Sequence, residues 1–524
     1  MRITDTEQRY QGHCWRLAAL ISWVAIGAAF AGDWPQYRGP TQDGVSTDRI
    51  NRQWTGSVTN ALWTVHLTNG LTSLAVSQGR VFTQVAGGFD GEGLPRKEYC
   101  LALSATNGTV LWSTEVENWP SNLYPGFGVG STDDGPRSTP TIEGDSVYVL
   151  SAYLKLWRLN VTNGAVVWQK DLRSLYGGSV IGWQNAASPL VDNGLIFINV
   201  NAGTQRIMAL RTSDGSLAWR SQNEAMTHAT PVLATIHGVR QLVFATQSGL
   251  VGLNPDDGTQ FWRMNHPFSY STSLAVSPVV YSNMVFTSGS YGMGSAVTRV
   301  NRTNDTWTTT LLWHNASSSR QSHWMTPVCH NGFLYGPYGS SASSPLKCVE
   351  MATGTEKWSV NNFGRGGVLL VNDQLLGLTE RGALVLIQPN PDAYTELARF
   401  QTIPNYNADA NKCWNVPAVA DGRVYVRSTA YAAAFDLSVP DLKLDAPQMG
   451  PANQMQLMVR TSEGTPVNAN RLTSLEVRAS TNLALAPTAW TKLTNALVLT
   501  NGVVRLTNVD AGAPRQFFIV SEPK

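Results

Sequence analysis

The sequence predicts an all-β protein, and three features of its composition and patterning support that class. The 524 residues are 43% hydrophobic but only 14% charged, against about 25% charged in an ordinary soluble domain. Glycine is frequent, with 46 residues, and many of the 18 tryptophans recur at regular spacing. Short apolar runs end at turn dipeptides such as Asn-Gly and Asp-Gly, which favour β-hairpins. The chain is therefore expected to fold into many short strands.

The balance of charge excludes several classes of function. Basic residues number 38 and acidic residues 36, which gives a net charge of +2. Proteins that bind nucleic acid usually cluster Lys and Arg to displace phosphate counterions. We therefore expect no nucleic-acid partner. The high apolar content also excludes disorder as the main state of the chain.

Residues 1–31 have the order of a secretory signal. Three arginines precede an apolar run over residues 17–31, which ends on Ala29-Phe30-Ala31. The run is shorter than the roughly 20 residues that span a bilayer, and Cys14 lies before it, where it could not serve as a lipid anchor. We predict cleavage near Ala31 and a periplasmic or secreted protein without a transmembrane segment, at most peripheral to the cell envelope.

The four remaining cysteines are Cys100, Cys329, Cys348 and Cys413. They show no C-x-x-C spacing, so zinc and thioredoxin-like sites are not expected. Cys329 and Cys348 are predicted on the first and third strands of one sheet, about 10 Å apart and beyond the reach of a disulfide. We expect free, buried thiols.

An internal repeat organises most of the chain. Each copy has an apolar strand, a turn that ends in Gly, and a Trp four residues after that Gly. Degenerate copies end at Trp63, Trp313 and Phe400, and successive copies are 42 to 56 residues apart. That period is the size of one four-stranded blade of a β-propeller. The full copies end at Trp112, Trp168, Trp219, Trp262 and Trp358.

The residues before each copy predict the other strands of a blade. Ser/Thr-Pro pairs such as Thr139-Pro140 are followed by a few apolar residues, a tight turn such as Asn193-Gly194, and an alternating strand. Proline suits the first position of a strand, where its missing N–H is not needed. Each unit is thus a meander of four strands.

Two incomplete units remain at the ends of the repeat region. Residues 416–437 supply three strands, and Ala61 to Val65 form a lone fourth strand. Joining the two completes an eighth blade and removes an exposed sheet edge. The sequence therefore predicts a strap over residues 32–59 and an eight-bladed β-propeller over residues 60–438. Trp63 and Tyr425 should then lie in one sheet.

The segment from Ala102 to Trp112 resembles the tryptophan-docking motif Ala-x-Asp-x-x-Thr-Gly-x-x-x-Trp, with Ser104 and Asn107 substituted. That motif belongs to the pyrroloquinoline-quinone-like (PQQ-like) propeller repeats, and Trp34-Pro35-Gln36-Tyr37-Arg38-Gly39-Pro40 is similar to the leader of their secreted bacterial members. The resemblance covers residues 33 to 437 and implies an eight-bladed fold. Related propellers act as scaffolds in outer-membrane protein assembly. The repeat tryptophans are expected to be structural, because each can bury its ring on the next blade.

The C-terminal part does not continue the repeat. Residues 439–451 are predicted to be a linker and residues 452–524 a small β-sandwich, since residues 474–479, 490–493, 503–506 and 517–520 alternate or gather apolar residues as strands do. This part is similar to small sandwich modules at the carboxyl ends of secreted proteins, which implies adhesion or spacing.

The candidate site lies at one mouth of the predicted propeller. Loops that enter the first strand of each blade and join its second and third strands meet there. Their cations and indoles favour a partner protein, a glycan, or a small anionic or aromatic ligand, although the same residues could simply fill the mouth. The candidate ligand-binding residues are Arg137, Trp183, Asn185, His228, Arg320, His323, Trp324, Arg365, Lys412 and Trp414.

The resemblance also implies an alternative, a PQQ-dependent (quinoprotein) dehydrogenase that oxidises alcohols or sugars. Such enzymes hold the quinone with calcium carboxylate ligands, an aspartate base and, commonly, a disulfide of adjacent cysteines. This chain has no adjacent cysteines, and the nearest carboxylates are Asp133, Asp134 and Glu224. We therefore assign no catalytic residue, metal or cofactor, with PQQ and calcium as the alternative. We expect a non-catalytic binding or scaffold protein.

Overall fold

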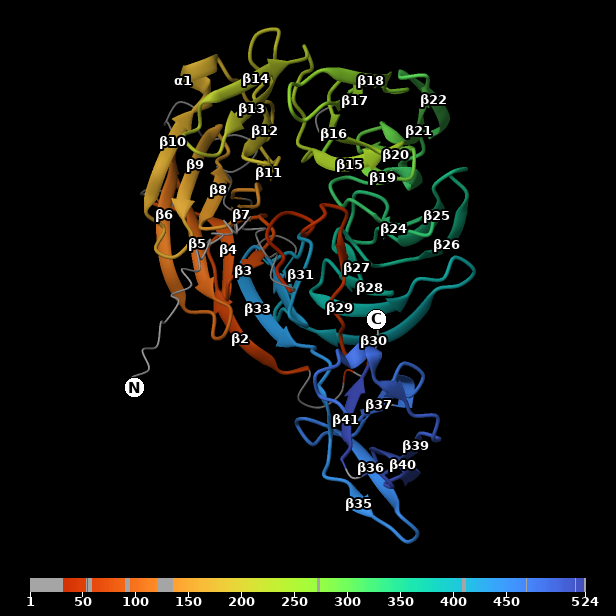
Figure 1. The fold of residues 1–524 in the computed structure, drawn as a ribbon. Coiled ribbons are helices and arrows are strands. Elements are labelled where there is room, and N and C mark those ends of the chain that lie inside the picture. The colour runs from red at the N-terminus through yellow and green to blue at the C-terminus, as the bar shows by residue number, and fades with distance from the viewer. Residues whose placement is uncertain are drawn as a thin grey trace, which may run out of the picture.

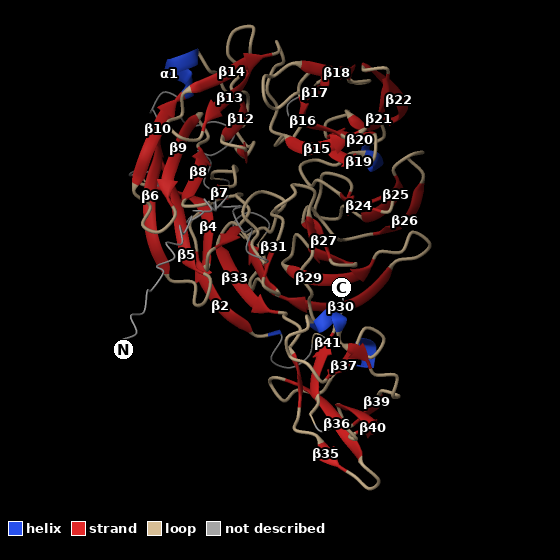
Figure 2. Cartoon of the chain, in the orientation of Figure 1, coloured by secondary structure: helices blue, strands red, loops and turns tan. Residues whose placement is uncertain are grey.

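The computed structural model describes residues 32–522, apart from residues 53, 55–58, 90–94, 120–134, 271–273, 408–410, 468 and 514. The predicted signal and its cleavage site, and also Asp133 and Asp134, lie outside the described residues. Strands dominate the described part, and helix is confined to a few short turns (Figure 2). The chain is all-β, as the sequence predicts.

Eight sheets built from antiparallel strand meanders are arranged around a common centre, with their first strands innermost (Figure 1). The first four follow one another along the chain. They are β3 (Ala75–Ser77), β4 (Arg80–Gly87), β5 (Lys97–Ser104) and β6 (Val110–Asn118); β7 (Thr141–Glu143), β8 (Ser146–Leu150), β9 (Lys155–Asn160) and β10 (Val166–Asp171), followed by α1 (Leu172–Tyr176); β11 (Leu190–Asp192), β12 (Leu195–Asn199), β13 (Ile207–Arg211) and β14 (Leu217–Ser221); and β15 (Val232–Ile236), β16 (Val239–Ala245), β17 (Gly249–Leu253) and β18 (Gln260–Asn265).

The next three sheets repeat the same order, and the third of them gains β1 as a parallel fifth strand. They are β19 (Val279–Tyr281), β20 (Met284–Gly289), β21 (Gly294–Thr303) and β22 (Thr306–Asn315); β23 (Val328–His330), β24 (Phe333–Pro337), β25 (Leu346–Glu350) and β26 (Glu356–Val360); and β27 (Gly367–Val371), β28 (Gln374–Leu378), β29 (Ala383–Gln388) and β30 (Thr395–Gln401), with β1 (Val45–Ser46).

Both ends of the repeat region meet in the eighth sheet. Three late strands, β31 (Ala418–Ala420), β32 (Arg423–Arg427) and β33 (Tyr431–Asp436), are completed by the early strand β2 (Ala61–His66). Trp63 and Tyr425 both pair with Ala434, and their ring centroids are 6.1 Å apart. The predicted pairing of the two incomplete units is therefore present.

The Gly-x-x-x-Trp repeat links each sheet to its neighbour. Trp112 donates from Nε1 to the carbonyl of Val161 at 3.1 Å, and its ring lies against Gly164, where an added Cβ would approach it to 2.6 Å. A ring can lie there because glycine lacks Cβ and adopts the positive φ of the turn. The same indole-to-turn bond is made by Trp63, Trp168, Trp219, Trp313 and Trp358.

Trp262 departs from this pattern. Its Nε1 donates to Oε1 of Gln241, which belongs to the same sheet. The next sheet offers no glycine turn, because β21 and β22 form a long hairpin whose turn is Asn304-Asp305. Trp262 therefore turns inward and is buried in its own sheet.

The N-terminal strap runs along the centre of the eight sheets. Trp34 pairs with Val76, and β1 pairs with the end of β27. Between them, the guanidinium of Arg38 is 2% exposed and donates to the carbonyls of Thr326 at 2.8 Å and Pro327 at 3.0 Å. The strap therefore contacts the innermost parts of several sheets.

The C-terminal part forms two further sheets below β2 and β30 in Figure 1. Core residues of both, such as Leu457 and Val477, share one hydrophobic cluster. Residues 439–451 are not a plain linker, because they supply β34 and β35, which pair with β36. The strands are β34 (Leu442–Leu444), β35 (Gln448–Met449), β36 (Gln454–Thr461), β39 (Val498–Thr500) and β40 (Val503–Asp510) in one sheet, and β37 (Glu476–Ser480), β38 (Thr491–Lys492) and β41 (Phe517–Ser521) in the other.

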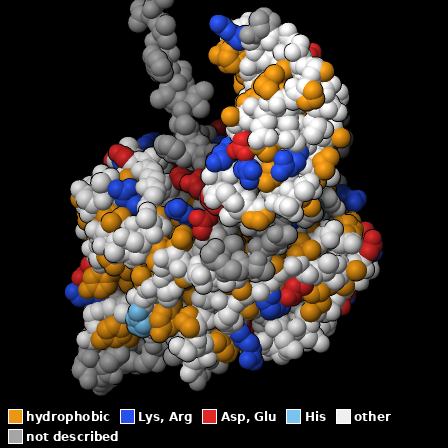
Figure 3. Space-filling view, turned by 90° about the horizontal axis from the view of Figure 1, so that it is seen from below, with side chains coloured by type: hydrophobic (Ala, Val, Ile, Leu, Met, Phe, Trp, Pro, Cys, Tyr) orange, Lys and Arg blue, Asp and Glu red, His pale blue; other side chains and the backbone are white. Residues whose placement is uncertain are grey.

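An ion-pair cluster joins this part to the strap. Glu522 contacts Arg471 at 2.7 Å and Arg49 of the strap at 3.0 Å. Elsewhere on the face seen from below, charged side chains of both signs are scattered among uncharged surface (Figure 3), as the low charge content leads one to expect.

The four described cysteines are free thiols. Cys329 lies on β23 and Cys348 on β25, with β24 between them. This is the arrangement that the sequence predicts.

Candidate functional site

The candidate site is built from loops at one end of the sheets. In a four-stranded meander, the start of the first strand and the turn between the second and third strands lie at the same end. Most of the predicted site residues stand in these loops, and the structure brings them together in two groups.

The first group surrounds the loop before β11. Nη1 of Arg137 donates to the carbonyl of Trp183 at 3.0 Å, and the guanidinium lies 5.9 Å from the indole centroid. Asn185 is 1% exposed, and its Nδ2 donates to the carbonyl of Ala187 at 3.0 Å. Asn185 therefore shapes its own loop and is not available to a ligand.

His228 holds the same loop from the neighbouring sheet. Its Nε2 lies 2.9 Å from the carbonyl of Gly182, so Nε2 carries the proton, because a carbonyl can only accept. Burial, and then the charge of Arg137, lower the pKa of His228 to about 4. The imidazole is therefore neutral at neutral pH.

The second group joins loops before β23, β27 and β31. The rings of Trp324 and Trp414 are 4.7 Å apart, and the ring of His323 is 3.9 Å from that of Trp324. Two cations lie against Trp414, with the guanidinium of Arg365 at 4.4 Å and Nζ of Lys412 at 4.3 Å from its centroid. These distances are within the range of cation–π attraction.

His323 is a buried member of the second group. Burial, followed by the charge of Arg365 and the neighbouring imidazole of His228, lowers the pKa of His323 to about 3. The indole Nε1 of Trp324 is buried without an acceptor among the described residues. A buried donor without an acceptor costs about 1–3 kcal/mol, so an acceptor that reached it would be stabilised.

Glu380 is a residue of this site that was not predicted from the sequence. Its side chain is fully buried in the turn between β28 and β29, where it accepts from Nη2 of Arg365 at 2.6 Å, Nε at 3.0 Å and the backbone N–H at 2.9 Å. Burial alone would raise the pKa of Glu380, but the hydrogen bonds from Arg365 outweigh it and lower that pKa. Glu380 is therefore ionised, and its carboxylate holds the guanidinium of Arg365 in place. Glu380 lies 15 residues after Arg365, and no sequence motif links the two.

A buried carboxyl pair lies at the same end of the first sheet. Glu98 and Glu117 stand opposite each other on β5 and β6. Burial, and then the charge of Glu117, raise the pKa of Glu98 to about 8. Both oxygens of Glu98 accept from the backbone N–H of Ala152 at 3.2 Å, and the carbonyl of Ala152 accepts from the N–H of Asn185 at 3.0 Å. The carboxyl pair thus supports the loop of the first group.

The remaining candidates are held elsewhere. Arg320 pairs with Glu356 of β26 at 3.2 Å, and no contact joins it to either group in the described part of the chain. Glu224 accepts from Nε of Arg263 at 2.6 Å and from Thr246 at 2.8 Å.

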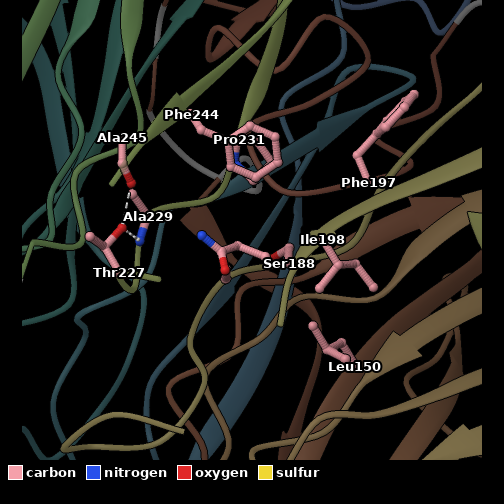
Figure 4. Close-up of a pocket in the computed structure, with 11 residues that line it drawn as sticks. Leu150, Ser188, Phe197, Ile198, Thr227, Ala229, Pro231, Phe244 and Ala245 are labelled. Atoms are coloured by element: carbon pink, nitrogen blue, oxygen red, sulfur yellow. Dashed lines mark hydrogen bonds between the residues drawn. The ribbon is translucent and has the colours of Figure 1, made fainter. Parts of the chain in front are cut away.

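A small cleft opens between the third and fourth sheets (Figure 4). Leu150, Phe197, Pro231 and Phe244 line it, and no charged side chain contributes to it. Thr227 closes one side by donating to the carbonyl of Ala245 at 2.6 Å. The cleft is apolar packing space between sheets and offers none of the cations of the two groups.

The family model described as outer membrane protein assembly factor BamB matches residues 53–174 and 96–360. Together these ranges cover more than half of the sequence. The chain belongs to the PQQ-like repeat family.

Individual members of the family are distant in sequence. The outer membrane protein assembly factor BamB of Moranella endobia (strain PCIT) is 21% identical over 315 residues, which are 59% of this chain and 66% of that protein. The same factor of Yersinia pestis is 23% identical over 303 residues, 56% of this chain and 61% of that protein. The chain thus spans less than two thirds of the length of these relatives.

A solved structure supports the propeller fold of this PQQ-like repeat protein. The quinohemoprotein alcohol dehydrogenase from Comamonas testosteroni aligns with a TM-score of 0.54 and 12% identity, over 82% of this chain and 84% of that one. At this identity the likeness shows the fold alone. No helix in the described part of the chain is long and apolar enough to cross a membrane.

The residues of the mouth that the structure describes do not fit a quinone held by calcium. Calcium prefers six to eight oxygen ligands, but Glu380 is taken up by Arg365. Within the described ranges no group of three or more His, Cys, Asp or Glu side chains could hold a metal ion. We therefore assign no step to such a group.

Proposed function

We propose that this PQQ-like repeat protein is a non-catalytic scaffold that binds a partner where Trp324 and Trp414 meet. Its residues 60–438 form an eight-bladed propeller closed by β2 and β33, and residues from about 439 to 524 form a small β-sandwich that acts as an adhesion or spacing module. The eight meander sheets and their shared centre support this architecture.

The observation that carries the proposal is the contact of Trp324, Trp414, Arg365 and Lys412 across three neighbouring sheets. Trp and Arg are the side chains that contribute most often to binding energy at protein interfaces. Both indoles are half-buried and the strap contacts the innermost strands of several sheets, so the surface is suited to a partner docking on it.

The similarity to two outer membrane protein assembly factors supports a scaffold role. We place this chain in the periplasm or outside the cell, after cleavage of the signal near Ala31. Arg137, Trp183 and His228 form a second part of the docking face, whereas Asn185 supports it and Arg320 lies apart from it.

The test uses the mature chain and two readouts. Incubation with pyrroloquinoline quinone and calcium should give neither stoichiometric quinone absorbance nor dye-linked alcohol oxidation, and turnover would overturn the proposal. Partner proteins retained from a periplasmic extract should be lost with Trp324→Leu. They should be kept with Trp307→Leu, a control in which another half-buried indole, stacked with Arg302 on the β21–β22 hairpin, is removed.

A further inference from the structure

The fifth sheet has a longer outer strand than the other sheets of the ring. β22 has ten residues and lies on the outer rim (Figure 1). The outer strands of the other seven sheets have five to nine residues in the described part of the chain. β20 pairs with β21 only as far as Arg299. Residues 300–303 and 306–309 therefore form a two-stranded ribbon that extends beyond β20.

One face of this ribbon packs on the fourth sheet. The ring of Trp307 lies 5.4 Å from that of Phe261, and Oγ1 of Thr309 donates to the carbonyl of Arg263 at 3.0 Å. The side chains that alternate with these two on β22, such as Thr308, are exposed. The ribbon is therefore held in position by the neighbouring sheet while its other face meets solvent.

The outer edge of β22 carries backbone groups that pair with no other sheet in the described part of the chain. Thr303 and Thr306 are partners on either side of a two-residue turn, and hydrogen-bonded and non-hydrogen-bonded pairs alternate from there. The N–H and C=O groups of Trp307, Thr309 and Leu311 consequently point away from β21. No backbone hydrogen bond joins these groups to another described sheet. An edge of this kind is a template for a further strand.

The features that usually protect an edge strand are missing over most of β22. Charged side chains, proline and bulges hinder the addition of a strand. β22 contains no Lys, Arg, Asp, Glu or Pro. Six of the other seven outer strands carry a charge, and the seventh, β2, has only six residues. The bulge of β22 lies at Leu312, so Thr306 to Leu311 keep an unbroken register against β21.

The side chains of this edge favour a second copy of β22 as its partner. In an antiparallel pair with a two-fold axis at Thr308, this residue faces its own copy and Thr306 faces Thr310. Threonine pairs across neighbouring strands stabilise a sheet, and the backbone groups of Trp307 would meet those of Thr309. A charged strand would repel its own copy across such an axis, whereas β22 has no charge. It also has no charge that could select the strand of another protein.

We propose that two copies of this chain pair through the outer edges of β22, so that the fifth sheets of two rings form one continuous antiparallel sheet. Each copy contributes the same residues to this interface, as two-fold symmetry requires. The interface uses none of the residues of the docking face and does not depend on the scaffold function.

The test is sedimentation equilibrium of the mature full-length chain, which should show a monomer–dimer equilibrium. Thr308→Lys places two like charges at the axis and should raise the dissociation constant of the dimer about tenfold or more. Thr308→Glu should do the same, and an equal mixture of the two variants should restore dimers, because Lys then faces Glu. Residue 308 is exposed, so the circular dichroism of both variants should match that of the natural chain.

The matched control is Thr64→Lys, which puts the same charge on an exposed threonine of another outer strand, β2. It should leave the dissociation constant unchanged, and so should Trp324→Leu, which tests the scaffold function separately. A chain that stays monomeric at every concentration would overturn the proposal. A dimer that Thr308→Lys does not weaken would place the interface elsewhere. A mixture of the two charged variants that stays monomeric would exclude the pairing of Thr308 with its own copy.

Discussion

The backbone N–H of Thr139 donates a 2.9 Å hydrogen bond to Oγ of Ser188 in the next sheet. The N–H of Ser188 in turn donates to Oγ1 of Thr230 at 2.9 Å, and Ser277 makes the same bond to Thr326 at 3.0 Å. These are the hydroxyl residues of the Ser/Thr-Pro motif. The motif therefore joins neighbouring sheets as well as starting a strand.

Ser188→Ala should destabilise the protein by about 1–3 kcal/mol, because it leaves the N–H of Thr139 buried without an acceptor. Ser188→Thr keeps a hydroxyl, as Thr230 and Thr326 do in their own sheets, and should cost much less. Urea denaturation followed by tryptophan fluorescence measures both. Equal midpoints for Ser188→Ala and the natural chain would contradict this role.

Gly164→Ala should destabilise more than Gly144→Ala. Both glycines have positive φ, 70° and 58°, so both variants pay for an unfavourable backbone. Only at Gly164 would the new Cβ also strike the ring of Trp112, whereas nothing lies within 4 Å at Gly144. Differential scanning calorimetry should show a melting temperature several degrees lower for Gly164→Ala than for its control. Equal shifts in melting temperature for the two variants would show that the ring of Trp112 moves aside for the new Cβ.

Glu98→Gln should remove part of the loss of stability that occurs as the pH rises from about 4.5 to about 8. The native state holds the proton of Glu98 up to a pKa of about 8, whereas the unfolded chain releases it near 4.5. The contribution of Glu98 is thus full below about pH 4.5 and is lost as the pH rises to about 8. Melting temperature measured across this window should fall less steeply in Glu98→Gln.

Glu224→Gln is the matched control for that experiment. Burial would raise the pKa of Glu224, but hydrogen bonds from Arg263, Ser248 and Thr246 outweigh it and lower that pKa. Its contribution is therefore present at neutral pH and lost under acid. If the melting temperatures of the two variants changed with pH in the same way, the buried pair of Glu98 and Glu117 would not be the cause of the stability loss.

Glu522→Gln should loosen the C-terminal sheets from the strap. The carboxylate bridges Arg471 and Arg49 and is largely buried, with 7% of its side chain exposed. Limited proteolysis should then cut faster between Leu437 and Leu442. Glu463→Gln, an exposed change in the same part of the chain, should leave the rate unaltered.

Much of the ring follows from the sequence because its information is local. A Gly and a Trp four residues apart mark one turn and one outer strand, and the recurrence of the pair gives the sheet order. The pairing of β2 with β33 also follows from the sequence, because the C-terminal unit lacks a fourth strand and the N-terminal unit consists of that strand alone. The pairing of the C-terminal strands β34 and β36 was harder to predict, because it depends on tertiary contacts and little on local sequence pattern.

The site was predicted less completely for the same reason. Trp324 and Trp414 stand at equal offsets before two blade prolines, so their meeting could be expected. Arg320 stands in the same loop as Trp324 but further from the blade proline Pro327, and Glu356 on β26 pairs with it. Glu380 and Tyr406 belong to the site through contacts with side chains far along the chain, and no regular sequence spacing predicts these contacts.

The contacts of Arg38 constrain the order in which parts of the molecule can fold. Its acceptors at Thr326 and Pro327 are synthesised 288 and 289 residues later, and β2 must likewise wait for β33. Residues 34–46 therefore cannot complete their contacts until most of the ring has been synthesised. A chain that lost residues 34–46 would still contain the four antiparallel strands of every sheet of the ring, but it would lack the contacts that the strap makes between them.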